Sequence, residues 1–168
     1  RALGFEMETL YDDGQRADAA TEAALKASHV DRDTLLSRAD FVVVQVPLTP
    51  ETRHLIGAAE LAKMKKSAVL IHAGRGGVVD DAALPAALKA GTIAAAALDC
   101  VDNEPSVDPS LLALPNVLFA PHIGSATPST RLNMAMLAMK NLAIGLSGQT
   151  PPNDVNALPP LAGGSSLD

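Results

Sequence analysis

The sequence predicts an α/β fold built on a doubly wound parallel sheet, and three observations predict it. Short, continuous runs of aliphatic residues recur along the chain, which is typical of strands buried on both faces of a parallel sheet. Segments with helix-capping residues lie between these runs, so strands and helices alternate. Aromatic residues make up only 2% of the chain while hydrophobic residues make up 48%, which favours a core of small aliphatic side chains.

The first half of the chain contains two predicted strands and two predicted helices. Residues 7–12 are expected to form a strand that ends in the turn Asp12-Asp13-Gly14. An Ala-rich surface helix is predicted at 17–27, and a short helix capped by Asp33 follows it. The run at 41–46 predicts a strand buried on both faces, which Pro47 ends.

The second half continues this alternation. A short helix is predicted at 60–65, and a buried strand at 68–72. Asp80 is expected to cap a helix that ends at Gly91, and a strand of small residues follows at 92–98. After a turn at 109–112, residues 117–120 predict the last strand, and Thr127-Pro128 begins a long helix that ends at Leu146.

Composition excludes several classes of partner. The net charge of -6 would repel a phosphate backbone, so nucleic acid is not an expected partner. No apolar stretch reaches the roughly 20 residues of a membrane span, and no secretory signal is recognisable. With its lone Cys100 the chain has no internal disulfide, so we expect a soluble cytoplasmic protein without membrane contact. The histidines His29, His54 and His72 lack partners at metal-site spacing, so no metal is expected.

Three charged side chains follow three different predicted strands. Arg75 follows the strand at 68–72, Glu104 follows the strand at 92–98, and His122 follows the strand at 117–120. In an open α/β sheet, ligands bind outside the carboxyl ends of the strands, so we expect these side chains to meet at one edge. The sequence therefore predicts a catalytic site made of Arg75, Glu104 and His122.

These three side chains suit the reduction of a small acid. The planar guanidinium of Arg75, which lies between glycines, matches a carboxylate with two parallel hydrogen bonds. His122 can hold a proton near neutral pH, and a neighbouring Glu104 carboxylate favours the protonated form that a general acid requires. The hydride must come from a cofactor, because no side chain supplies one.

Ordered motifs connect the chain to a known family. They are residues 46–53 (VPLTPETR), 73–80 (AGRGGVVD), 97–99 (ALD) with 103–105 (NEP), and 121–127 (PHIGSAT). With these motifs the chain closely resembles the D-isomer-specific 2-hydroxyacid dehydrogenases, in particular glyoxylate/hydroxypyruvate and 2-ketogluconate reductases. The resemblance extends from Gly4 to Asn156, and four motifs in this order are specific.

The resemblance implies a role for each site residue. Arg75 is similar to the family's arginine for the substrate carboxylate, His122 to its acid/base, and Glu104 to the residue that positions that histidine. Asp99 is similar to the aspartate that receives the nicotinamide carboxamide. The expected cofactor-binding residues are Asp13, Val46, Pro47, Ala73, Gly74, Arg75, Asp99, His122 and Gly124.

The resemblance also implies NAD as the cofactor. Asp13, or Asp12 if the first strand is one residue shorter, resembles the acid that accepts the adenosine ribose hydroxyls. Its negative charge would repel a 2′-phosphate and so favour NAD over NADP. Arg16 close by keeps NADP as an alternative.

The family's pattern is incomplete in this chain. We expect the first strand of a Rossmann-like sheet, its Gly-x-Gly-x-x-Gly loop and most of the substrate domain to precede Arg1, so the fold is expected to be N-terminally truncated. Residues 1–150 are expected to form a partial NAD(P)-binding domain, and the Pro-, Gly- and Ser-rich residues 151–168 a linker or tail leading back toward the substrate domain. The expected assembly is a homodimer, in which the run Met134, Met136 and Met139 could pack.

The leading hypothesis is the NAD(P)-dependent reduction of glyoxylate, hydroxypyruvate or a related 2-oxo acid to the D-2-hydroxy acid, with the 168 residues alone inactive. One alternative is formate oxidation, but that branch of the family carries Gln where this chain has Glu104. Another is a nucleotide-sensing, corepressor-like interaction module, which predicts NAD(H)-dependent partner binding with negligible turnover.

Overall fold

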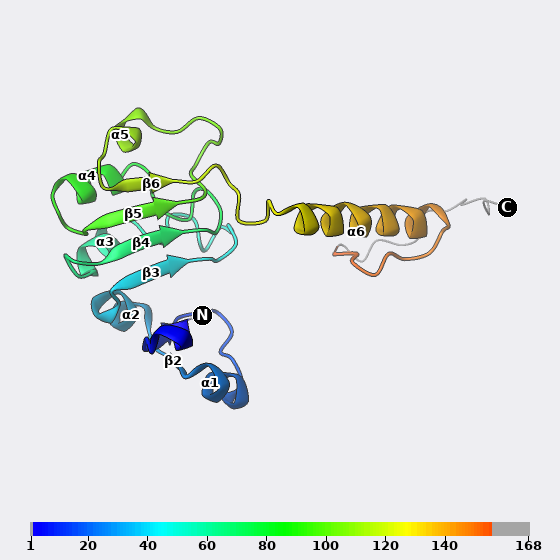
Figure 1. Cartoon of the computed structure of the whole chain (residues 1–168), viewed down its shortest axis with the longest axis horizontal. Coiled ribbons are helices and arrows are strands. Elements are labelled where there is room, and N and C mark those ends of the chain that lie inside the picture. The colour runs from blue at the N-terminus through cyan, green and yellow to red at the C-terminus, as the bar shows by residue number, and fades with distance from the viewer. Residues whose placement is uncertain (1, 156–168) are drawn as a thin grey trace. The chain divides into compact units, whose positions relative to one another are not determined.

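The computed structural model describes residues 2–155 and divides into two compact units, Arg1–Pro121 and His122–Asp168. The first unit is an α/β structure in which all paired strands are parallel, as the sequence predicts (Figure 1). The second unit contains a single long helix among its described residues. The predicted α/β class with a parallel sheet is therefore confirmed.

Strands and short helices alternate along the first unit. In chain order its elements are η1 (Ala2–Phe5), β1 (Thr9–Tyr11), α1 (Ala19–Leu25), β2 (Ala27–His29), α2 (Arg32–Arg38), β3 (Phe41–Val44), α3 (Ala58–Lys63), β4 (Val69–His72), α4 (Leu84–Lys89), β5 (Ala95–Leu98), α5 (Pro109–Leu112) and β6 (Val117–Phe119).

Three local predictions were wrong. The helix predicted to extend to residue 27 ends earlier, because Lys26 adopts a left-handed conformation (φ 49°) and the chain turns into β2, which the sequence did not predict. Asp31, not Asp33, caps α2, since its carboxylate accepts a hydrogen bond from the Thr34 N–H at 2.9 Å. Asp80 lies in the turn before α4, whose N-cap residue is Ala83.

The strands form two parallel sheets rather than the single sheet that was predicted. One sheet contains β1 and β2, and the other has the order β3-β4-β5-β6. Each pair in the larger sheet is in register, so that Val44 lies opposite His72 and His72 opposite Leu98. The carboxyl ends of these strands are therefore level at one edge of the sheet.

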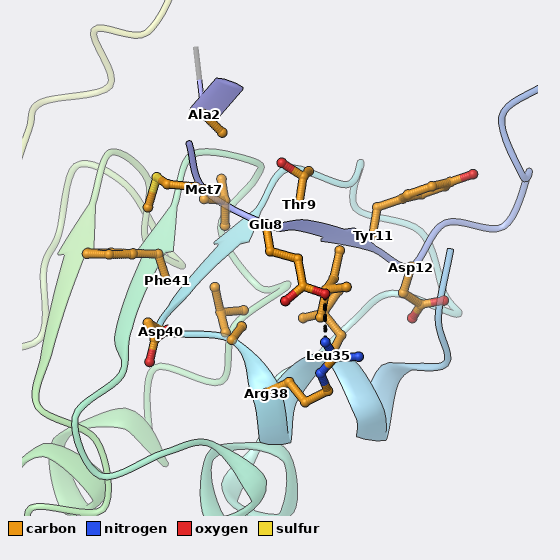
Figure 2. A pocket seen from close by; sticks show the side chains of 14 residues that line it. Ala2, Met7, Glu8, Thr9, Tyr11, Asp12, Leu35, Arg38, Asp40 and Phe41 are labelled. Carbon is orange, nitrogen blue, oxygen red and sulfur yellow. Dashed lines mark hydrogen bonds and ion pairs between the residues drawn. The ribbon is translucent and has the colours of Figure 1, made fainter. Parts of the chain in front are cut away.

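A cavity of about 510 Å³ lies between β1 and β3, and we call it the slot. Figure 2 shows side chains of β1, β3 and α2 around it, with an ion pair of 2.6 Å between Arg38 Nη2 and Glu8 Oε1. Within residues 2–155, neither β1 nor β3 has a second strand partner on the side of the slot. The slot separates the smaller sheet from the larger one.

The hydrophobic core lies on one face of the larger sheet. Helices α2 to α5 contribute Leu36, Leu61, Leu84 and Leu111, which pack against Leu70 and its buried neighbours. The prediction that 41–46 is buried on both faces was wrong, because side chains alternate: Val42 and Val44 are buried, whereas Phe41 and Val43 are exposed. Only one face of β3 meets the helix layer, and the other is uncovered.

The second unit contains α6 (Pro128–Leu146), the predicted long helix. Thr127 caps it, accepting a hydrogen bond from the Thr130 N–H at 3.2 Å, and Pro128 occupies the first turn. None of its residues is buried. Of the predicted linker at 151–168, residues 156–168 lie outside the described residues. No helix in the described part of the chain is long and apolar enough to cross a membrane.

Candidate functional site

The segments that follow β3, β4 and β5 leave the sheet side by side. Just beyond the strands, the Ala73 N–H donates to the Val44 carbonyl at 3.1 Å, and the Asp99 N–H donates to the His72 carbonyl at 2.8 Å. Because the strands are parallel and in register, these bonds join the three segments at the carboxyl edge of the sheet. Ligands of open α/β sheets bind at this edge.

Arg75 lies in a tight loop after β4, and its side chain is exposed. Its Nη1 donates to the Gly74 carbonyl at 3.1 Å. The Arg75 carbonyl is held from two sides, since it lies 2.9 Å from His72 Nε2 and accepts a hydrogen bond from the Val78 N–H at 3.2 Å. The backbone that carries the guanidinium is thereby held in place, while the residue itself is exposed.

His72 supports this loop from the core. The residue is 1% exposed, and this burial lowers the pKa of its imidazole below the ordinary value. Contacts with the Arg75 and Val44 backbone act in the opposite direction but have the smaller effect. The neutral ring must carry its proton on Nε2 in order to donate to the Arg75 carbonyl. Its Nδ1 has no hydrogen-bond partner among the residues that the structure describes.

Two glycines let the Arg75 loop pass between its neighbours. A Cβ on Gly74 would lie 2.8 Å from the Val46 carbonyl oxygen, and a Cβ on Gly76 would lie 2.0 Å from the Val101 carbonyl oxygen. Real Cβ atoms essentially never approach other atoms within 3.0 Å, so both positions require glycine. The loop therefore lies in direct contact with the segments after β3 and β5.

Glu104 lies in the loop after β5 and is exposed. Its Oε1 accepts a hydrogen bond from the Val101 N–H at 3.0 Å. Val101 is also the residue whose carbonyl contacts Gly76, so the Glu104 loop and the Arg75 loop share this neighbour. The preceding Asn103 has φ 58°, a left-handed conformation that asparagine tolerates better than most residues.

Cys100 lies beside this site but does not suit a nucleophile. The side chain is buried, and its Sγ lies 3.8 Å from the His72 carbonyl. Burial raises the pKa of the Cys100 thiol to about 11, so the reactive thiolate is not formed near neutral pH. Cys100 is a small core residue.

His122 and Gly124 belong to the second unit, in which His122 is the first residue. The chain just before it is fixed to the sheet, since the Ala120 N–H donates to the Leu98 carbonyl at 2.9 Å. His122 has φ 52°, in the left-handed region where non-glycine residues are uncommon and strained positions cluster at functional sites. Its convergence with the site residues of the first unit stays a prediction.

The turn after β1 holds the acids expected to bind the adenosine ribose. Asp12 Oδ2 pairs with Arg32 Nε at 3.2 Å, whereas Asp13 is exposed and its Oδ1 accepts a hydrogen bond from the Gln15 N–H at 3.0 Å. Within residues 2–155 no arginine pairs with Asp13. Of the two predicted candidates, Asp13 therefore has the more available carboxylate.

The arrangement fits a nicotinamide dinucleotide along the carboxyl edge. The expected cofactor residues of the first unit follow strands there: Asp13 after β1, Val46 and Pro47 after β3, Ala73 and Gly74 after β4, and Asp99 after β5. The bare backbone at Gly74 permits close approach of a ligand. The 168 residues contain no Gly-x-Gly-x-x-Gly sequence for the pyrophosphate. Among residues 2–155, no group of three His, Cys, Asp or Glu could hold a metal ion.

Sequence reasoning missed two features of the candidate site. The first is Glu22, which binds Arg16 and thereby engages the cation that kept NADP as an alternative. Its spacing of six residues from Arg16 matches none of the helical pair rules, so no sequence signal pointed to it. The second is the contact between Gly76 and Val101, which depends on two loops that are far apart in the sequence.

Comparison with known proteins gives a consistent picture. A model of the family described as "D-isomer specific 2-hydroxyacid dehydrogenase, NAD binding domain" matches residues 1–124. A glyoxylate/hydroxypyruvate reductase B from Pectobacterium atrosepticum is 54% identical over 155 residues, which is 92% of this chain and 48% of that protein. The chain spans about half the length of the curated relatives that it matches.

Solved structures agree with this finding. The holo form of D-mandelate dehydrogenase from Rhodotorula graminis matches with a TM-score of 0.84 at 36% identity, covering 95% of this chain and 47% of that one. An NADPH-dependent glyoxylate/hydroxypyruvate reductase from Sinorhizobium meliloti, in complex with NADP and malonate, matches with a TM-score of 0.81 at 35% identity, covering 88% and 46%. These relatives do not favour the formate or nucleotide-sensing alternatives.

Proposed function

The chain belongs to the D-isomer specific 2-hydroxyacid dehydrogenase family, and from this premise we propose that the full-length protein reduces a small 2-oxo acid, such as glyoxylate or hydroxypyruvate, to its D-2-hydroxy acid. The observation that carries the proposal is the loop after β4, which presents Arg75 on a backbone fixed by a buried histidine and two obligatory glycines. Such a rigid cation at the carboxyl edge suits recognition of a carboxylate.

Arg75 would bind and orient the acid in this reaction. Its guanidinium matches the two oxygens of a carboxylate, and its backbone is held at the sheet edge by the bond between the Arg75 carbonyl and His72 Nε2. A reduced nicotinamide, when bound, supplies the hydride for the carbonyl carbon. Holding the acid by its carboxylate fixes which face of the carbonyl is presented.

His122 would donate the proton to the carbonyl oxygen, with Glu104 positioning its ring. The left-handed backbone at His122 supports a functional role, because such strain persists only where the surroundings impose it. The hydrogen bond from the Val101 N–H to Glu104 Oε1 supports this role, because it holds the carboxylate in the loop after β5. General acid catalysis of this kind contributes about 10²–10⁴-fold to a rate.

NAD(H) is the cofactor that we propose, with NADP(H) as the alternative. Asp13 presents an exposed carboxylate after β1, which suits the two hydroxyls of an adenosine ribose and repels a 2′-phosphate. Asp99, which follows β5, would receive the carboxamide of a nicotinamide. The relatives include proteins named for NAD and for NADP complexes, so their names do not decide between the two.

The remainder of the full-length protein would complete the sheet and the site. We assign residues 1–150 to the cofactor-binding domain and residues 151–168 to a linker toward a substrate domain. A parallel strand from the rest of the full-length protein would fill the slot, since β1 and β3 both line it and each belongs to a parallel sheet. In the doubly wound order 3-2-1-4-5-6, the strand at this position leads into the phosphate-binding loop.

A homodimer in the cytoplasm is part of the same proposal. Helix α6 has no buried residue, and its exposed large side chains include Leu132, Met134, Met136, Met139 and Leu142. A second copy would cover this apolar helix, because isolated helices of this kind rarely stay exposed to water. Light scattering on the full-length protein should give twice the mass of one chain, and a monomer at micromolar concentration would remove this part of the proposal.

The direct test is a substrate panel on the full-length protein. Oxidation of NADH and of NADPH is followed by the loss of the absorbance of the reduced nicotinamide. The acids tested are glyoxylate, hydroxypyruvate, 2-ketogluconate and pyruvate. We expect turnover with at least one of the first two acids. No turnover with any of the four would overturn the proposed reaction.

A further inference from the structure

The guanidinium of Arg16 is bound by one carboxylate through two of its three nitrogens. Arg16 Nε donates to Glu22 Oε1 at 2.9 Å, and Arg16 Nη2 donates to Glu22 Oε2 at 3.0 Å. The pair is thus bidentate, the strongest geometry available to arginine and a carboxylate. Both oxygens of Glu22 are used in it.

A second contact holds Glu22 in this position. The Tyr11 hydroxyl donates to Glu22 Oε1 at 2.6 Å and accepts a hydrogen bond from the Ala17 N–H at 3.0 Å. The Glu22 side chain is 16% exposed, whereas that of Arg16 is 65% exposed. The hydrogen bonds from Arg16 and Tyr11 lower the pKa of Glu22 to about 2, so the carboxylate stays ionised at neutral pH.

This network stands beside the proposed ribose site. Tyr11 is the last residue of β1, and the turn that carries Asp13 connects it to Arg16. A 2′-phosphate at the end of this strand would need a cation, and arginine is the side chain best suited to it. Arg16 is three residues from Asp13, but its donors on the side of Glu22 are already occupied.

We propose that Glu22 is a specificity-determining residue for the cofactor, which keeps Arg16 from a 2′-phosphate and so biases the protein toward NAD(H). Glu22 acts on the cofactor through Arg16, so it is a positioning residue. Asp13 repels the phosphate directly, and Glu22 withholds a nearby cation, Arg16, that could offset this repulsion. The inference rests on the proposed function, because it concerns the same dinucleotide site.

The test measures equilibrium binding of NADH and NADPH to the full-length protein by calorimetry, independently of turnover. Glu22→Ala should tighten NADPH binding roughly three- to tenfold, the range of one charge-assisted contact at a partly exposed site, with NADH binding within about twofold of wild type. Glu22→Gln keeps the shape of the side chain and should give a smaller gain. Arg16→Ala in the Glu22→Ala background should return NADPH binding to the wild-type value.

Asp33→Ala is the matched control. It removes a carboxylate from another exposed ion pair, with Lys63 Nζ at 2.6 Å from Asp33 Oδ1, so it reports the general effect of one less negative charge. Its NADPH affinity should stay within about twofold of wild type. Unchanged NADPH binding in both Glu22 variants, or the same gain without Arg16, would overturn the inference alone. A full-length protein that binds neither dinucleotide would overturn the proposed function as well.

Discussion

The contact between Gly76 and Val101 offers a sharp test of the site geometry. In Gly76→Ala, the added Cβ would lie 2.0 Å from the Val101 carbonyl oxygen and 2.9 Å from the Asp102 backbone nitrogen. Since real Cβ contacts essentially never fall below 3.0 Å, one of the two backbones must move by at least about 1 Å. Neither can yield by rotating a side chain, because both are main chain.

The displacement should reach both proposed catalytic loops. Gly76 adjoins Arg75, and the Val101 N–H binds Glu104 Oε1 at 3.0 Å. Misplacement of catalytic groups by 1 Å lowers rates by about 10²-fold, and overpacking of this kind destabilises a fold by about 1–3 kcal/mol. We expect kcat/KM of full-length Gly76→Ala with glyoxylate or hydroxypyruvate to fall about 100-fold, alongside a lower thermal midpoint.

Gly91→Ala separates lost stability from lost geometry. Gly91 has φ +65°, so alanine there is strained by about 1–2 kcal/mol, yet its Cβ would meet nothing within 4 Å. This variant should lose a similar amount of thermal stability while its kcat/KM stays within about twofold of wild type. Full activity in Gly76→Ala, or equal losses of activity in both variants, would refute the reasoning.

Four further predictions follow from the same structure. In the full-length protein, His122→Gln should lower turnover by about two to four orders of magnitude with cofactor affinity unchanged, and a variant that keeps most of its turnover would remove His122 from the mechanism. The amide nitrogen of His72→Gln can reach the position of Nε2, so this variant should keep the wild-type KM for the 2-oxo acid, whereas His72→Asn should raise that KM roughly two- to tenfold. Equal KM values in the two variants would show that the bond to the Arg75 carbonyl is unimportant. Burial lowers the pKa of His72 in the folded protein below its ordinary value of 6.5, so below that pH the unfolded chain binds more protons than the folded one. The wild type should therefore lose thermal stability relative to His72→Gln as the pH falls through about 6.5. Thermal midpoints of the two proteins that change with pH in parallel would contradict this. The Asp40 and Val44 carbonyls accept hydrogen bonds from the β4 side, so the backbone N–H groups of Phe41 and Val43, which alternate with them, point toward the slot. A strand in the slot should therefore protect the amides of Phe41 and Val43 from hydrogen exchange as strongly as the amide of Val42 is protected. Fast exchange of the Phe41 and Val43 amides would show that the slot holds no strand.

The sequence predicted those elements that have a strong local signal. The aliphatic runs around Val42, Leu70 and Leu118 fixed three strands to within two residues at each end, and Thr127-Pro128 located the start of α6. Such signals come from periodicity and capping chemistry, which depend on residues that are adjacent in sequence.

The features that failed prediction depend on tertiary context. The strand β2 consists of Ala27, Ser28 and His29, which have no alternating pattern and form a strand only because β1 lies alongside. The exposure of Val43 likewise reflects what covers the sheet, not the residue itself. The division into two sheets also depends on which strands lie side by side, and no local pattern encodes that.

The candidate site was predictable in part. Strand ends placed Arg75, Asp99 and Glu104 correctly after β4 and β5, because parallel strands bring their carboxyl ends to one edge. The ion pair of Glu22 with Arg16 joins helix α1 to the turn before it, and the contact of Gly76 with Val101 joins two loops, so sequence alone gave no indication of them.

The most direct test of the central claim is a crystal structure of the full-length protein with a nicotinamide cofactor and oxamate, an unreactive analogue of a 2-oxo acid. We expect the oxamate carboxylate within about 2.7–3.2 Å of the Arg75 guanidinium nitrogens, and a His122 ring nitrogen at a similar distance from the amide oxygen that replaces the reacting carbonyl. The Glu104 carboxylate should contact the other ring nitrogen. Oxamate bound away from Arg75, or His122 turned away from it, would contradict the account.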